Sequence, residues 1–80
     1  MSASQVIQAG GYYIRCWGEF DQEKGQWRPV ISFERVADYS KTLVPGIRHQ
    51  LAAWFATEKE AARVAEEQFP RLIESGEVGL

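Results

Sequence analysis

One cysteine and one histidine are the side chains of this 80-residue chain best suited to covalent chemistry. A thiolate becomes a strong nucleophile when a nearby imidazole takes its proton, so Cys16 and His49 form the candidate dyad. The sequence supplies no third group to orient the imidazole. Cys16 also lies in an alternating segment, where cysteine behaves as a small hydrophobic residue. We therefore predict no catalytic residue and no enzymatic activity.

Metal, phosphate and paired-carboxylate sites are not indicated either. One Cys and one His fall short of a zinc ligand set. Gly10-Gly11 precedes a strand pattern and does not open a helix, as a phosphate-binding loop would. Acidic neighbours such as Glu66-Glu67 lie on the polar side of a predicted helix, where they serve solubility and capping. The sequence thus predicts no metal site and no cofactor.

Composition and charge restrict the class of protein. Nine Lys and Arg residues against eleven Asp and Glu give a net charge of -2, which disfavours a general nucleic-acid binder. No apolar run approaches the ~18 residues needed to cross a bilayer. A single Cys permits no internal disulfide, and residues 1–5 lack the pattern of a signal peptide. We expect a cytoplasmic protein without membrane association.

Two alternating segments predict an antiparallel hairpin. Residues 12–20 place Tyr12, Ile14, Cys16 and Phe20 on one side and Tyr13, Arg15, Trp17 and Glu19 on the other. Residues 27–35 repeat the pattern, and the polar residues 21–26 between them include a glycine and form the loop. Pro29 cannot donate a ladder hydrogen bond, so we expect it near the strand start or facing an edge.

Residues 47–55 fit both a strand and a helix pattern. The next residues favour a strand, because Thr57 and Glu60 form a capping box that starts a helix at Glu58. That helix continues with apolar residues at spacings of three and four, bends or breaks near Pro70, and ends at Gly76. The connection 36–46 is long enough to be mobile or functional.

The predicted fold is α+β: a three-stranded antiparallel sheet with one C-terminal helix packed on one face. Residues 1–10 form a flexible arm, residues 11–76 the single domain, and residues 77–80 a tail. The predicted core comprises Tyr12, Ile14, Cys16, Phe20, Ile31, Phe33, Leu51, Ala53, Phe55, Ala62, Ala65, Phe69, Leu72 and Ile73.

Two motifs carry a resemblance to known families. Gly25, Trp27 and Pro29, followed by Phe55, Thr57, Glu60 and Ala61, match the Gly-x-Trp-x-Pro and Phe-x-Thr-x-x-Glu-Ala motifs of small uncharacterised proteobacterial domains. The chain resembles those domains over most of residues 12–76, which implies a bacterial origin and a fold but no activity. The element order is also similar to antitoxin domains of the HicB type, although their Pro-Asp segment between strand and helix is missing here.

The sheet face that the helix leaves uncovered is the informative surface. By alternation it carries Tyr13, Arg15, Trp17, Arg28, Val30, Ser32, Arg48, Gln50, Ala52 and Trp54. Tyr, Trp and Arg are enriched at the centres of protein interfaces. The predicted binding residues are Tyr13, Arg15, Trp17, Arg28, Arg48 and Trp54.

Three interpretations of this face remain open. The first is an interface for a protein partner or for a second copy of the chain. The second is a stacking platform for single-stranded RNA, with antitoxin-like regulation as one possible role. The third is an ordinary solvent-facing surface whose Arg stems lie over the aromatic rings. Steep salt dependence would distinguish nucleic-acid binding from protein binding.

Overall fold

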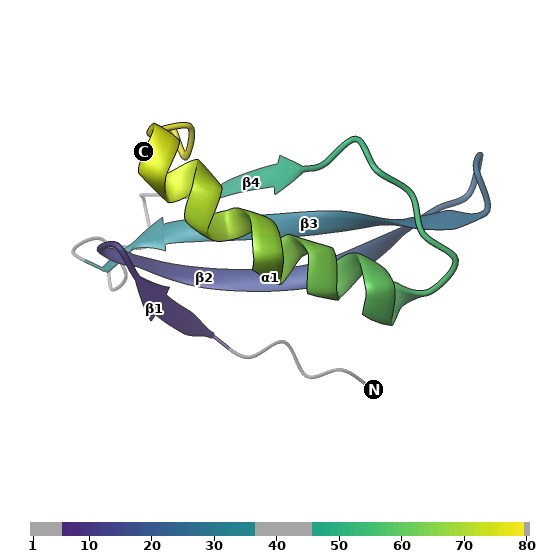
Figure 1. Ribbon diagram of the computed structural model, residues 1–80, viewed down its shortest axis with the longest axis horizontal. Coiled ribbons are helices and arrows are strands. Elements are labelled where there is room, and N and C mark those ends of the chain that lie inside the picture. The colour runs from purple at the N-terminus through teal and green to yellow at the C-terminus, as the bar shows by residue number, and fades with distance from the viewer. Residues whose placement is uncertain (1–5, 37–45, 80) are drawn as a thin grey trace.

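The computed structural model describes residues 6–36 and 46–79. The elements are β1 (Ile7–Ala9), β2 (Tyr12–Asp21), β3 (Gln26–Arg35), β4 (Ile47–Gln50) and α1 (Glu58–Ser75). The strands form one antiparallel sheet in the order β1-β2-β3-β4. α1 crosses one face of this sheet, so the fold has the two α+β layers that were predicted (Figure 1).

The sheet has one strand more than predicted. The added strand, β1, lies within residues 1–10, which were expected to form an arm, and pairs with β2 from Ile7↔Ile14 to Ala9↔Tyr12. Gly10 and Gly11 reverse the chain with φ values of 59° and 83°, a conformation that favours glycine. Three residues are too few to show an alternating pattern. Of the connection 36–46, only Val36 and Gly46 lie within the described residues.

The β2–β3 hairpin confirms the two predicted strands and their loop. Ten residue pairs connect the strands, from Tyr12↔Arg35 to Asp21↔Gln26. In the loop, the Asp21 carboxylate accepts the backbone N–H groups of Glu23 and Lys24 at 2.9 and 3.1 Å. Gly25 has a φ of 63° and donates its N–H to the Asp21 carbonyl at 2.8 Å. These bonds hold the loop closed.

Pro29 lies near the start of β3, as predicted, and its nitrogen points to the side on which β4 has ended at Gln50. It is the fourth residue of β3 and is buried. Its carbonyl accepts the N–H of Leu51 at 3.0 Å, but the proline has no N–H to donate in return. The ladder between β3 and the chain beyond β4 is therefore incomplete at Pro29.

This gap divides the segment 47–55 that was predicted to be one strand. β4 ends at Gln50, which pairs with Val30, and pairing resumes only at the bridge between Phe55 and Trp27. Between these two pairs the segment advances five residues, from Gln50 to Phe55, while β3 advances three, from Val30 to Trp27. Residues 51–54 therefore bulge out of the ladder. Trp27 and Phe55 exchange two backbone hydrogen bonds of 2.8 Å each, so pairing resumes there with the register shifted by two residues.

Both ends of α1 are capped as predicted. The Thr57 hydroxyl accepts the Glu60 N–H at 3.2 Å and donates to the Glu60 carboxylate at 3.1 Å. The capping box had predicted that this carboxylate would accept the backbone N–H of Thr57 instead. Gly76, with a φ of 74°, ends the helix. The helix was predicted to bend or break near Pro70, and it does not break, since α1 continues through this exposed residue. Water can satisfy the backbone group that proline leaves free there.

The core lies between α1 and the centre of the sheet. Ile14, Ile31, Phe33 and Ala65 are fully buried, as predicted. The prediction was wrong for Phe20, whose side chain is 48 % exposed because it lies beyond the first turn of α1. It was also wrong at the helix, where Ala61 and not Ala62 faces the sheet.

Within the predicted tail 77–80, Val78 packs onto the domain, and Leu80 lies outside the described residues. Val78 is 2 % exposed and belongs to the core cluster. The Val78 carbonyl lies 2.9 Å from His49 Nε2, which donates the hydrogen bond. These two contacts attach the end of the chain to β4.

Replacing Gly18 by Ala is expected to lower the free energy of unfolding by about 1–3 kcal/mol. The added β-carbon would lie 2.8 Å from the Glu58 carbonyl oxygen and 3.0 Å from the Ala61 β-carbon. Urea unfolding followed by tryptophan fluorescence measures the change, and an unchanged m value assigns it to the native state. A midpoint equal to that of the wild type would show that α1 does not approach β2 this closely.

Replacing Val78 by Ala is expected to lower the free energy of unfolding by about 2 kcal/mol, because it removes buried methyl groups from the core. Glu77→Ala is the matched control, since Glu77 is exposed and its side chain has no hydrogen bond or ion pair to residues 6–36 or 46–79. The control should change stability by less than about 0.5 kcal/mol. Equal effects of the two substitutions in thermal unfolding would contradict the packed position of Val78.

Candidate functional site

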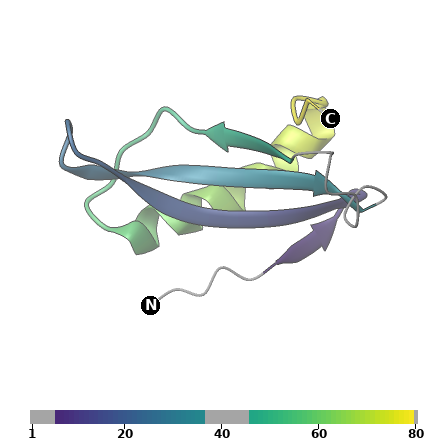
Figure 2. The same ribbon diagram turned by 180° about the vertical axis from the view of Figure 1, so that it is seen from behind.

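The sheet face opposite α1, called the outer face below, gathers side chains from three strands. The register places the following residues on it: Tyr13, Arg15, Trp17 and Glu19 of β2, Arg28, Val30, Ser32 and Glu34 of β3, and Arg48 and Gln50 of β4. Figure 2 shows this face with the strands in front and α1 behind them. The predicted division of β2 and β3 into two faces is therefore what the structure shows.

The six predicted binding residues all lie on or beside this face. Five of them project from the strands, and the sixth, Trp54, comes from the bulge at residues 51–54. Because Phe55 pairs with Trp27, the preceding residue, Trp54, lies next to Arg28 on the outer face. The bulge thus brings Trp54 to the position that an uninterrupted strand was expected to provide.

Cations lie over both indole rings of the outer face. The Arg48 guanidinium is 5.5 Å from the centroid of Trp17, and the Arg28 guanidinium is 4.6 Å from that of Trp54. Lys24 also lies over Trp54, at 4.9 Å. Such contacts orient the cation and the ring and contribute about 0.5–1 kcal/mol each at exposed sites. Lys24 was not among the predicted binding residues, because its position depends on how the hairpin loop folds.

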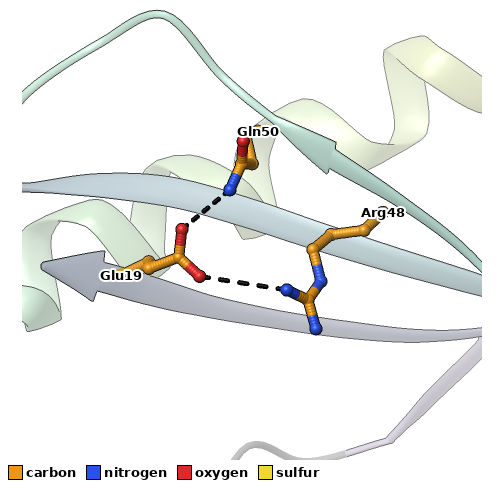
Figure 3. Close-up of polar contacts among 3 residues, drawn as sticks. All are labelled: Glu19, Arg48 and Gln50. Atoms are coloured by element: carbon orange, nitrogen blue, oxygen red, sulfur yellow. Dashed lines mark hydrogen bonds and ion pairs between the residues drawn. The ribbon is translucent and has the colours of Figure 1, made fainter. Parts of the chain in front are cut away.

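Glu19 of β2 reaches across β3 and contacts two side chains of β4. Its carboxylate accepts a hydrogen bond from Gln50 Nε2 at 2.8 Å and lies 3.9 Å from Arg48 Nη1 (Figure 3). The Arg48 side chain is 59 % exposed, so this ion pair contributes little to stability. The alternation already placed Glu19 on this face, but its carboxylate was not considered as part of the site.

Two further details show how closely side chains cover the sheet. Val30 is fully buried although it points to the outer face, where Trp17 and Gln50 flank it. The Nε atom of Arg28 is buried without a hydrogen-bond partner among residues 6–36 and 46–79. The Arg28 guanidinium lies against the Trp54 ring, at 4.6 Å from its centroid.

An open hollow of about 440 Å³ lies at the β4 side of the outer face. It is lined by Arg15, Trp17, Ser32, Glu34, Gly46, Ile47 and Arg48. The register places Arg15, Ser32 and Arg48 directly beside one another on three adjacent strands. The Arg48 guanidinium lies over Trp17 and beside Glu19, so the hollow combines two arginines and one hydroxyl group in its lining, groups that suit a small anionic group.

The structure separates the Cys16–His49 pair that was considered as a dyad. Both residues face α1, but Ile31 lies between them in the register, so their backbones are about 9–10 Å apart. Burial, with a smaller contribution from the nearby Glu66 charge, raises the pKa of the Cys16 thiol to about 12. His49 bonds to the Val78 carbonyl and packs edge-on against Phe33. Cys16 is thus a core residue, and His49 is held by Val78 and Phe33.

Within residues 6–36 and 46–79, no three His, Cys, Asp or Glu side chains are close enough to hold a metal ion together. The helix in this part of the chain is too polar to span a bilayer. Comparisons with protein-family models, with curated proteins and with solved structures found no match to this chain. Its function must therefore be argued from the outer face itself.

The stability that the buried Cys16 thiol contributes is expected to fall as the pH rises from about 9 toward 12. The thiol has an ordinary pKa of 9.0 and a folded-state pKa of about 12, so the folded protein holds this proton more tightly than the unfolded chain. The contribution of the thiol to stability is therefore present in full below about pH 9 and is lost as the pH rises toward 12.

Urea unfolding of the wild type and of Cys16→Ala at about pH 8 and about pH 10.5 measures this effect. The variant should lose less stability between the two pH values, because its other titrating groups are unchanged. Equal losses would show that Cys16 does not titrate differently in the folded and unfolded states.

Proposed function

We propose that this chain is a small non-catalytic module that binds a protein partner, or a second copy of itself, through the outer face. The observation that carries the proposal is the continuous surface of Tyr13, Trp17 and Trp54 interleaved with three arginines. Residues of these types dominate the centres of protein interfaces. The cation contacts hold the rings and guanidinium groups in place before binding, which lowers the entropy lost on association.

Single-stranded RNA binding is the second candidate, in which Trp17 or Trp54 would stack on bases and arginines would contact phosphates. The paired arrangement of arginine and indole favours this candidate. Against it, Glu19 and Glu34 place two carboxylates on the same face, and the chain carries a net charge of -2. We therefore rank the protein partner first and propose a cytoplasmic location, which suits a lone cysteine in the thiol form.

Trp17→Ala and Trp54→Ala are each expected to weaken partner binding at least about tenfold, as central interface residues do. Tagged wild-type protein would retain partners from a cell extract, and mass spectrometry would identify those that the two variants fail to retain. Calorimetry with the purified partner then measures the affinities. Lys59→Ala and Arg63→Ala, on the exposed side of α1, are the matched controls and should bind like the wild type.

Two measurements separate the alternatives. Sedimentation velocity over a range of concentrations shows whether the partner is a second copy of the chain. Titration with a mixed-sequence single-stranded oligonucleotide at low and high salt tests the RNA candidate through tryptophan quenching. Salt-sensitive quenching that Arg15, Arg28 and Arg48 substitutions reduce would replace our proposal by the second candidate. Equal binding of outer-face and α1 variants to every partner would contradict both.

A further inference from the structure

We propose that the hollow on the outer face binds a carboxylate side chain, presented by an acidic segment of a different protein, between Arg15 and Arg48. The inference deepens the proposed function and rests on it, because it names the chemistry by which the outer face recognises its partner. Four observations support it: the alignment of the side chains, the free donors, the adjoining indole and the charge of the lining.

The alignment comes from the strand register. Arg15, Ser32 and Arg48 lie directly opposite one another on β2, β3 and β4. Neighbouring strands are about 4.8 Å apart, so the two arginine backbones are separated by about 10 Å, with the serine hydroxyl between them. A carboxylate seated over Ser32 would accept hydrogen bonds from the hydroxyl and from the Arg15 guanidinium. The Arg48 guanidinium, which lies beside Glu19, would join them by turning toward the carboxylate.

The donors of this row are available. Arg15 is exposed, and neither Arg15 nor Ser32 has a side-chain hydrogen bond or ion pair to the part of the chain that the structure describes. Arg48 lies over the Trp17 ring and has an ion pair of 3.9 Å with Glu19, which is longer than a hydrogen bond. An incoming carboxylate would therefore replace one weak contact with shorter, charge-assisted bonds.

Trp17 gives the hollow an apolar wall beside these donors. Its indole lies under the Arg48 guanidinium at 5.5 Å and lines the same hollow. This wall would contact the aliphatic stem of a glutamate or aspartate, while the contact with the ring keeps Arg48 in place. Gly46 lies against the side of Glu34, at the end of the hollow, where a side chain would collide with the Glu34 stem.

The lining charge favours a protein segment over a nucleic-acid strand. Two arginines and Glu34 surround the hollow, so one carboxylate is attracted while a closely following negative charge meets Glu34. A nucleic-acid strand brings a phosphate with every nucleotide and gains affinity from neutralising many of them. An acidic peptide can alternate carboxylates with uncharged residues and so match this surface.

The test is a titration of ¹⁵N-labelled protein, observed by NMR, with a short acetylated and amidated peptide rich in glutamate. We expect shifts at the side-chain N–H groups of Arg15 and Arg48 and at the Ser32 amide, and none with the same peptide carrying glutamine. Arg15→Gln and Arg48→Gln should each weaken binding about tenfold, whereas Lys59→Gln on α1 should not. Glu34→Gln should tighten binding severalfold, a gain that misfolding cannot produce.

Several results would overturn this inference. Equal shifts with the glutamine peptide, or unchanged affinity in Arg15→Gln, would remove the carboxylate site. Tighter binding of oligothymidylate through the same arginines would assign the hollow to phosphate. Self-association through these arginines would assign it to a second copy. If Trp17→Ala abolishes partner binding while both arginine variants retain it, the proposed function stands and this inference fails. If neither tryptophan nor arginine variants lose the partner, both fail.

Discussion

The close contact between α1 and the centre of the sheet is the constraint on which the rest of the structure depends. One helix must bury the inner face of a four-stranded sheet, and it does so because glycine and alanine meet where the backbones approach. Gly18 leaves no side chain beneath the helix, and Ala61 and Ala65 keep the helix surface flat. Larger residues above and below, such as Phe33 and Phe69, fill the space that remains. Residues 6–36 and 46–79 contain no second helix that could lie on the outer face, and the side chains of that face cover it instead.

A single missing hydrogen-bond donor has an equally large effect on that outer face. Pro29 interrupts the ladder near the start of β3, and residues 51–54 leave the strand geometry at that point. The segment returns two residues out of step, which places Trp54 beside Arg28. A donor at position 29 would favour continuous pairing and would move this indole along the sheet. The arrangement of aromatic and basic residues on the outer face thus depends on a backbone defect as well as on side-chain chemistry.

Local patterns in the sequence were sufficient to predict β2 and β3 with their two faces, and α1 with its capped ends, because alternation and capping act over a few residues. The same patterns placed the predicted binding residues on the outer face. They could not reveal β1, whose three residues are too short to alternate, or the packing of Val78, which depends on distant contacts with His49 and the core. The roles of Glu19 and Lys24 were missed for the same reason, since both depend on side chains brought together by the fold. Predicting contacts between elements requires the register, and the bulge changes the register in a way that periodicity does not record.

The consecutive order of the strands has a consequence for how the chain reaches this structure. Every pairing among the four described strands joins neighbours along the chain. The β2–β3 hairpin has the most residue pairs, and backbone hydrogen bonds to Asp21 close its loop. Such local contacts require little loop-closure entropy, which is typical of rapidly folding proteins. An isolated two-stranded hairpin is only marginally stable in water, however. The hairpin would therefore form early and transiently, and the arrival of α1, the last element along the chain, would make the structure permanent.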